Sequence, residues 1–184
     1  MTLAEKLVEL HRALGRARLP HAFGGAIALA YVTRDPRGTN DIDVNIFVPA
    51  EDAERVLAVL PEGVVRPPGT AETVAREGQV RLWWDGTPLD LFFNYAPVHD
   101  EAALNRRTVP FEGIKIPVLG PVELAVFKIM FDRTRDWADL EAMADRGTLD
   151  FDSVRAALSG MVGADDQRLA RLAAVERAAS SSSS

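Results

Sequence analysis

Residues 37–44 read Arg37-Gly38-Thr39-Asn40-Asp41-Ile42-Asp43-Val44, and they decide the fold that we expect for this chain. Turn-forming residues fill positions 35–40, whereas Ile42 to Val48 is rich in β-branched and apolar side chains. The pattern therefore predicts a loop that leads into a strand. Because side chains of a strand alternate between its two faces, Asp41 and Asp43 should share one face while Ile42 enters the core.

Asp41 and Asp43 place two carboxylates about 7 Å apart along the predicted strand. Their mutual repulsion is relieved when a cation lies beside them, and Mg²⁺ takes oxygen ligands of this kind. The pair is therefore a candidate metal site. The same tripeptide also occurs at strand ends where both aspartates are solvated, so the pattern by itself leaves both interpretations open.

A third carboxylate, Asp90, lies within the otherwise apolar segment Pro88-Leu89-Asp90-Leu91-Phe92-Phe93. Burying a lone charge is costly, so Asp90 should face a cation or another partner, unless this side of its strand is wet. If the two strands are neighbours, the three carboxylates would converge, as two-metal phosphoryl transfer requires.

The first 119 residues alternate between helical and strand patterns. Leucines at helical spacing predict an amphipathic helix from Leu3 to Leu14, with Gly15 as its stop. His21–Phe23, Gly24-Gly25 and residues 26–32 predict a strand, a glycine turn and a buried helix. We further expect a short helix over 51–60, a loop over 61–69, a hairpin of strands 79–85 and 89–94 joined through 86–88, and a hairpin over 108–119 around Gly113.

From Pro121 to about Ala179 the pattern is helical, with interruptions near 146–148 and 160–163. The sequence thus predicts an α/β (α+β) protein with a mixed-sheet core over residues 1–119, followed by a helical region over 120–179. Serines 180–184 carry no apolar side chain. We predict a tail or linker there and exclude it from function.

Composition excludes several classes of protein. The 184 residues include no cysteine and only three histidines, without ligand-like spacing, which excludes a thiolate centre and argues against a histidine-rich zinc site, but not against oxygen-ligated Mg²⁺ or Mn²⁺. No apolar run is long enough to cross a membrane and no signal-peptide pattern opens the chain, so we expect a cytoplasmic protein without a membrane partner.

The net charge of −6 argues against a uniformly basic nucleic-acid binder. Residues 1–40 and 101–135 nevertheless carry more basic than acidic side chains. These basic residues either line a cleft or are scattered and solvated. Trp83 and Trp84 present a similar choice, because one of them could face outward as a base-stacking platform or both could belong to the core.

Gly24-Gly25 followed by Arg37-x-Thr39-x-Asp41-x-Asp43 resembles the signature of the nucleotidyltransferase superfamily related to DNA polymerase β. More narrowly, it resembles the AbiEii-type nucleotidyltransferases, which include toxins of toxin–antitoxin pairs. The downstream motifs Ile116-Pro117-Val118-Leu119-Gly120-Pro121-x-Glu123-Leu124-x-x-x-Lys128 and Arg135-Asp136-x-x-Asp139-Leu140 are similar as well. The resemblance covers roughly residues 20–145 and implies a polymerase β-like core whose active-site cleft is completed by the helical region.

The resemblance implies that Asp41 and Asp43 bind Mg²⁺, and that Asp90 completes the metal site and helps to deprotonate the attacking hydroxyl. The nucleotide would be held mainly by backbone and basic groups. Gly24 and Gly25 would let the backbone approach the triphosphate at a helix N-terminus, although an ordinary strand-to-helix turn also needs glycine. The remaining motif residues, Arg37 and Thr39, would position the metal loop or touch phosphate.

Lys128 lies in the helical region and has two interpretations. Its spacing from Asp132, Arg135 and Asp139 would form one polar stripe on a continuous helix, which favours a solvent-exposed ladder of ion pairs. The resemblance implies instead that Lys128 contacts nucleotide phosphate and that Asp139 supports it. The short segment between Lys128 and Arg135 departs from the family pattern, favours a continuous helix, and leaves open whether Asp136 or Asp139 is the functional carboxylate.

The resemblance implies an enzyme, a Mg²⁺-dependent nucleotidyltransferase that moves a nucleoside monophosphate from an NTP to a hydroxyl acceptor and releases pyrophosphate. The implied acceptor is RNA, at the 3′ end of tRNA, and the implied partner is a cognate antitoxin. One alternative is a small hydroxylated acceptor such as an aminoglycoside, which the acidic net charge favours. Another is a non-catalytic interaction module on the same fold, against which the presence of Asp41, Asp43, Asp90 and Lys128 argues.

Overall fold

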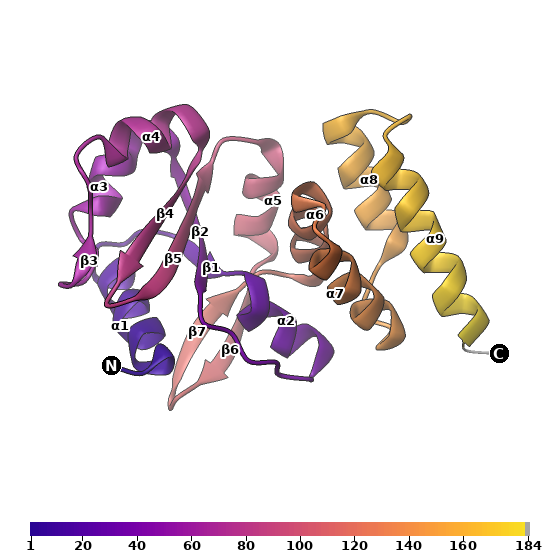
Figure 1. The fold of residues 1–184 in the computed structure, drawn as a ribbon, viewed down its shortest axis with the longest axis horizontal. Helices are drawn as coiled ribbons and strands as arrows, with labels where there is room; N and C mark the ends of the chain where they lie inside the picture. The colour runs from indigo at the N-terminus through magenta and orange to yellow at the C-terminus, as the bar shows by residue number, and fades with distance from the viewer. Residues whose placement is uncertain (183–184) are drawn as a thin grey trace. The chain divides into compact units, whose positions relative to one another are not determined.

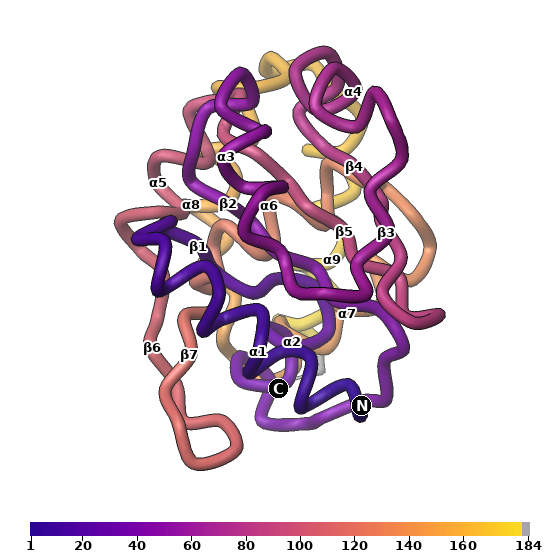
Figure 2. Tube along the Cα trace, turned by 90° about the vertical axis from the view of Figure 1, so that its left-hand side faces the viewer, coloured from indigo at the N-terminus to yellow at the C-terminus, as the bar shows by residue number. Residues whose placement is uncertain are grey.

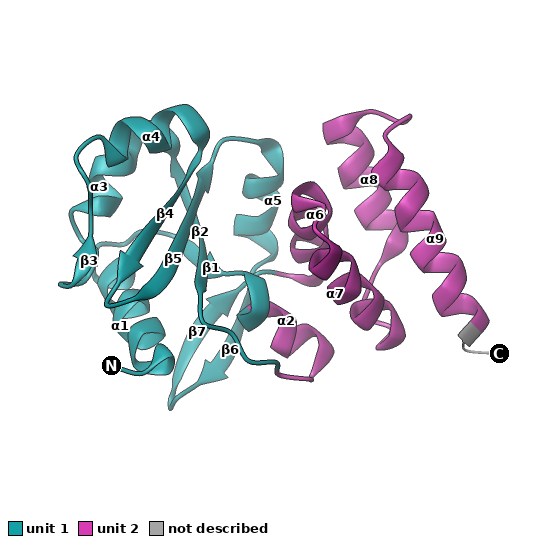
Figure 3. Cartoon of the chain, viewed as in Figure 1, with its two compact units in different colours: residues 1–27, 37–119 teal, residues 28–36, 120–184 magenta. Residues whose placement is uncertain are grey.

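The computed structural model describes residues 1–182, which fall into two compact units (Figure 3). Unit 1 comprises residues 1–27 and 37–119, and unit 2 comprises residues 28–36 and the chain from Gly120 onward. Unit 1 contains the strands, and unit 2 is helical within the described residues.

The described part of unit 1 contains a mixed sheet of seven strands in the order β3-β4-β5-β2-β1-β7-β6 (Figure 1). The strands are β1 (His21–Phe23), β2 (Ile42–Pro49), β3 (Val64–Val65), β4 (Gln79–Trp84), β5 (Thr87–Asn94), β6 (Arg107–Phe111) and β7 (Ile114–Val118). The pairs β2–β5 and β1–β7 are parallel and the others are antiparallel. The predicted mixed α/β class is confirmed.

Two tight turns fix the register of the hairpins. Asp85-Gly86 joins β4 to β5 and Glu112-Gly113 joins β6 to β7, and all four residues have positive φ, as type I′ turns require. Such turns match the right-handed twist of the flanking strands. The first hairpin therefore turns one residue earlier than predicted, because Thr87 already pairs with Trp84.

Unit 1 also contains the helices α1 (Leu3–Arg16), η1 (Ala50–Asp52), α3 (Ala53–Leu57), α4 (Thr70–Glu77) and α5 (Pro97–Asn105). As predicted, α1 is amphipathic and buries Leu7, Leu10 and Leu14, but it runs past Gly15 to Arg16. Lys6 of α1 donates from Nζ to the Trp84 carbonyl oxygen at 2.5 Å and to Thr87 Oγ1 at 3.0 Å, which ties α1 to the β4–β5 hairpin.

Three elements of unit 1 lie where the sequence predicted only a loop or no element. Val64 and Val65 of the predicted loop form β3 at the edge of the sheet, because they pair with Trp84 and Trp83. The segments of α4 and α5 had no assigned pattern. Figure 2 shows α3 beside α4, and α4 also packs against β4.

Unit 2 contains most of α2 (Gly25–Thr33), together with α6 (Pro121–Phe131), α7 (Thr134–Asp145), α8 (Phe151–Val162) and α9 (Gln167–Ser182). The chain breaks at the two predicted interruptions and also at Asp132, which has φ +53°. The predicted tail begins inside α9, and residues 183–184 lie outside the described residues. Within residues 1–182, no helix combines the length and apolar character that a membrane span needs.

Candidate active site

The two aspartates of the D-x-D motif lie where the alternation of strand side chains predicted. Ile42 and Val44 are fully buried, whereas Asp41 and Asp43 are partly exposed. Thr39 Oγ1 donates a short hydrogen bond to Asp41 Oδ1 and therefore orients that carboxylate. Arg37, in the preceding turn segment, is exposed.

The glycine pair lies directly against Asp43. The Gly24 N–H donates to the Asp43 carbonyl oxygen at 2.9 Å, and Gly25, with φ +49°, begins α2. A Cβ atom at Gly25 would lie 1.9 Å from Asp43 Oδ2, which no side chain permits. The sequence has glycine here because the Asp43 carboxylate occupies the space at the N-terminal turn of α2.

Asp90 is brought to Asp43 by the parallel pairing of β2 and β5. In that register Asp43 is directly opposite Asp90, and Gly24 is next to Asp43 on the other side. Leu89 and Leu91 of β5 are fully buried, while Asp90 is on the opposite face with Asp43. The two strands are therefore neighbours, which is the condition that the sequence analysis left open.

Arg81 of β4 is the partner that the buried Asp90 was predicted to have. Its Nε donates to Asp90 Oδ1 at 2.7 Å and its Nη2 donates to Asp90 Oδ2 at 2.6 Å, so the guanidinium covers both carboxylate oxygens. This pair raises the pKa of Arg81, and the charges of Asp41 and Asp43 raise it further. Sequence reasoning missed Arg81, although the Asp85-Gly86 turn places it opposite Asp90.

The donor set of this face suits a hard cation, but its geometry is not that of a formed metal centre. Carboxylate oxygens are the ligands that Mg²⁺ and Mn²⁺ prefer. Within residues 1–182, no three histidine or acidic side chains gather closely enough to hold a metal ion. Both oxygens of Asp90 are hydrogen-bonded to Arg81.

The two tryptophans of β4 have different environments. Trp84 is fully buried and belongs to the core, whereas Trp83 is 50% exposed. Trp83 lies on the same face of β4 as Arg81 and pairs with Pro88 of β5. The exposed indole therefore lies two residues along the same strand face from Arg81.

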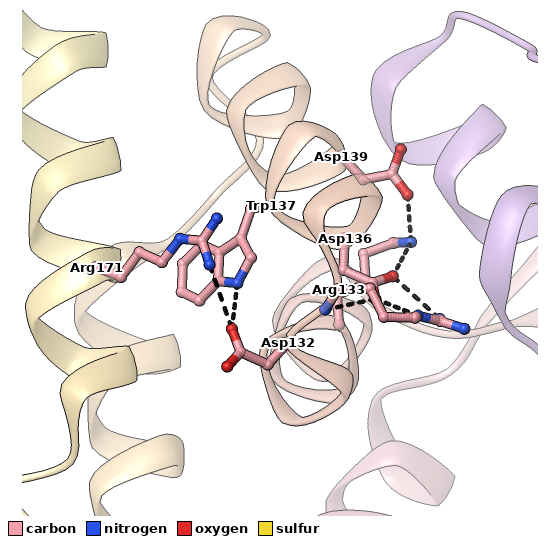
Figure 4. A network of polar contacts seen from close by, with 7 residues as sticks. Asp132, Arg133, Asp136, Trp137, Asp139 and Arg171 are labelled. Carbon is pink, nitrogen blue, oxygen red and sulfur yellow. Dashed lines mark hydrogen bonds and ion pairs between the residues drawn. The ribbon is translucent and has the colours of Figure 1, made fainter.

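Lys128 belongs to unit 2 and is buried there, 5% exposed, between the carboxylates of Asp136 and Asp139, both of which are labelled in Figure 4. Its Nζ lies 2.6 Å from Asp139 Oδ2 and 3.8 Å from Asp136 Oδ1. Asp136 is held mainly by Arg133, whose Nε donates to it at 2.6 Å. Asp139 is thus the direct partner of Lys128, and Asp136 joins Lys128 to Arg133.

The predicted solvent-exposed ladder on one continuous helix is wrong. Asp132 adopts a left-handed conformation and ends α6, so Lys128 and Asp139 lie on two separate helices. Asp132 then accepts a hydrogen bond from Trp137 Nε1 at 2.6 Å, which fixes the turn between α6 and α7. Two helices that pack together can bury the Lys128–Asp139 pair, which the side of a single helix could not.

No protein-family model and no curated protein sequence matches this chain. Its structure is similar to the solution structure of the antibiotic-resistance factor ANT(2'')-Ia, with a TM-score of 0.62, 13% identity and 95% of each chain covered. The crystal structure of ANT(2'')-Ia in complex with adenylyl-2''-tobramycin gives a TM-score of 0.55, 16% identity and full coverage of both chains. A nucleotidyltransferase-like antigenic protein from Paracoccidioides brasiliensis gives 0.52 and 20%, with 94% of this chain and 91% of that one covered.

The chain has a nucleotidyltransferase fold. Identities of this size show the fold alone, and the narrower resemblance to AbiEii-type toxins stays a prediction. Within this fold, the glycine turn, the D-x-D strand and Asp90 of unit 1 lie on neighbouring strands of one sheet.

We predict that Gly25→Ala displaces the Asp43 carboxylate. Gly113→Ala is a matched control, because Gly113 also has positive φ but has open space around it. Both variants carry backbone strain, and only Gly25→Ala adds the clash, so chemical denaturation should show an additional loss of about 1–3 kcal/mol for Gly25→Ala. Equal losses in the two variants would show that the Asp43 carboxylate does not fill this space.

We predict that Lys128→Ala lowers the free energy of unfolding by about 3–5 kcal/mol, because it leaves buried carboxylates without their counter-ion. Arg146→Ala, which breaks the exposed pair with Asp35 in the same unit, should change it little. The double variant Lys128→Met/Asp139→Leu should recover part of the loss. Equal stability of Lys128→Ala and the unaltered protein would show that the Lys128 side chain is solvated and not buried against the two carboxylates.

Proposed function

We propose that this protein is a nucleotidyltransferase that transfers a nucleoside monophosphate from an NTP to a hydroxyl group of an acceptor. The observation that carries the proposal is the position of Asp43 directly opposite Asp90 on neighbouring strands, beside the glycine turn that begins α2, with Asp41 immediately before β2. The nucleotidyltransferase fold supports it.

Asp41 and Asp43 would hold a divalent ion together with Asp90. When bound, Mg²⁺ or Mn²⁺ neutralises phosphate charge and favours in-line displacement. The Asp43 carboxylate fills the space beside Gly25, so the glycine turn would serve the triphosphate through the backbone N–H groups at the start of α2, where an anion is favoured. Thr39 supports this site by orienting Asp41, and a role for Arg37 stays a prediction.

The transfer step forms a bond between the acceptor oxygen and the α-phosphorus and breaks the bond between the α-phosphorus and the β-bridging oxygen. Pyrophosphate leaves with the electrons of that bond. Asp90 would accept the proton of the attacking hydroxyl. The roles of Lys128 and Asp139 toward the nucleotide stay predictions. Because this pair is buried, we also propose that it positions α6 and α7 relative to each other.

For the acceptor we propose a small hydroxylated molecule that carries amino groups. Asp43 and Asp90 lie opposite each other, the charge of Asp41 also acts on Arg81, and these three carboxylates outnumber that arginine, so this region favours a cation over the phosphate backbone of an RNA. The similarity to ANT(2'')-Ia, which has been crystallised with adenylyl-2''-tobramycin, supports this class and covers the whole chain.

An RNA acceptor is the second candidate, and exposed arginines support it. Arg34, Arg107 and Arg135 are exposed and could contact phosphate, whereas Arg133 already holds Asp136. The tRNA acceptor, the antitoxin partner and the toxin role that the AbiEii resemblance implies stay predictions.

The direct test incubates the purified protein and Mg²⁺ with each labelled NTP and either tobramycin or total cellular RNA. We expect label on the aminoglycoside, and we expect Asp41→Asn and Asp43→Asn each to lower the rate by more than about 100-fold. Asp52→Asn, which neutralises an exposed aspartate outside this face, is the matched control.

Two other outcomes of that experiment are informative. Label in the tRNA size range, in an amount that falls steeply as salt is added, would show that the acceptor is RNA and not a small molecule. The salt dependence is expected because a protein that binds RNA phosphates releases counter-ions. Labelling of neither acceptor with any NTP, by a protein that melts cooperatively, would contradict the proposed activity toward both classes.

A further inference from the structure

The contact between Arg81 and Asp90 cannot persist unchanged if Asp90 binds a metal ion. Arg81 donates one hydrogen bond to each of the two Asp90 oxygens, at 2.7 and 2.6 Å. A carboxylate in this bidentate pair has both oxygens turned toward the guanidinium. An oxygen offered to a divalent cation must therefore first give up its bond to Arg81.

The two partners differ in their freedom to move. The Asp90 side chain is 13% exposed and extends from a central strand, whereas the Arg81 side chain is 51% exposed. Its guanidinium can turn into solvent without opening the core. Asp90 has no such alternative, because its neighbours Leu89 and Leu91 are fully buried on the other face of β5.

Electrostatics explains why an arginine lies at this position. Asp43 is directly opposite Asp90, and two like charges across neighbouring strands destabilise a sheet. The guanidinium supplies the positive charge that compensates them, on the side of Asp90 away from Asp43. A divalent cation would supply the same compensation from a different position.

We propose that Arg81 is an internal counter-ion that holds Asp90 in the metal-free protein and competes with the divalent cation for it. Arg81 is thereby a positioning residue that sets the metal affinity of the site. The inference rests on the proposed function, since it takes Asp41, Asp43 and Asp90 as metal ligands. It adds that the site changes from a guanidinium-bound to a metal-bound form by exchange of one cation for another.

Mn²⁺ binding tests this without any activity assay. Titration of the nucleotide-free protein, with unbound Mn²⁺ measured by electron paramagnetic resonance, should show about tenfold tighter binding for Arg81→Ala than for the unaltered protein. Arg81→Lys should lie between the two, because lysine keeps the charge and loses the two-pronged geometry. Arg76→Ala is the matched control, since it removes the same charge from an exposed pair with Glu77.

Thermal unfolding gives a second readout and checks folding. Without metal, Arg81→Ala should melt lower than the unaltered protein, because Asp90 loses its partner. Added Mn²⁺ should then raise its Tm by more than it raises that of the unaltered protein. An NMR signal of the Arg81 Nε–H group, assigned by its loss in Arg81→Lys, should exchange faster with solvent when diamagnetic Mg²⁺ is added.

The outcomes separate this inference from the proposed function. If the unaltered protein binds Mn²⁺, Asp41→Asn abolishes binding and Arg81→Ala binds with equal or lower affinity, the competition is overturned while the metal site stands. If neither the unaltered protein nor Arg81→Ala binds Mn²⁺, with or without nucleotide, both the competition and the proposed metal site are overturned.

Discussion

Asp43 and Asp90 are directly opposite each other on two parallel strands, and the local structure of unit 1 depends on how that repulsion is compensated. Three features around the pair respond to it. Arg81 covers both oxygens of Asp90, Gly25 leaves space for the carboxylate of Asp43, and Thr39 holds the neighbouring Asp41. Each of these residues would be unremarkable on an ordinary sheet surface. Together they retain like charges on one face, which is costly for stability and is typical of a site that binds a cation.

Unit 2 also holds charged side chains away from water, but there they compensate each other in an ion pair between two helices. Lys128 is buried, and its charge is met by Asp139 and, more distantly, by Asp136. A buried ion pair contributes little net stability, but loss of one partner is costly because the other remains buried. The pair therefore constrains α6 and α7 to the arrangement that keeps both partners together, and the hydrogen bond from Trp137 to Asp132 fixes the turn between them.

The sequence predicted those parts of the fold that depend on local patterns. Alternation along 41–44 placed Asp41 and Asp43, and the glycine pair marked the turn into α2. Arg81 was missed because its role depends on register: moving the hairpin turn from 86–88 to Asp85-Gly86 is what puts Arg81 opposite Asp90. The break at Asp132 was missed because a left-handed aspartate leaves no strong signal in a sequence. The burial of Lys128 followed from that break, since it arises from the packing of two helices.

Disulfide formation across β2 and β5 tests whether Asp43 and Asp90 share one face of the sheet, and the chain suits this experiment because it contains no cysteine. With Asp43→Cys and Asp90→Cys in one protein, the two thiols extend from the same face of neighbouring strands, within the separation that a disulfide spans. We expect this pair to oxidise rapidly to an intramolecular disulfide. We expect no disulfide for Asp43→Cys with Leu91→Cys, because those two side chains are on opposite faces of the sheet. The reverse pattern would show a register shifted by one residue and would contradict the shared carboxylate face on which the proposed function depends.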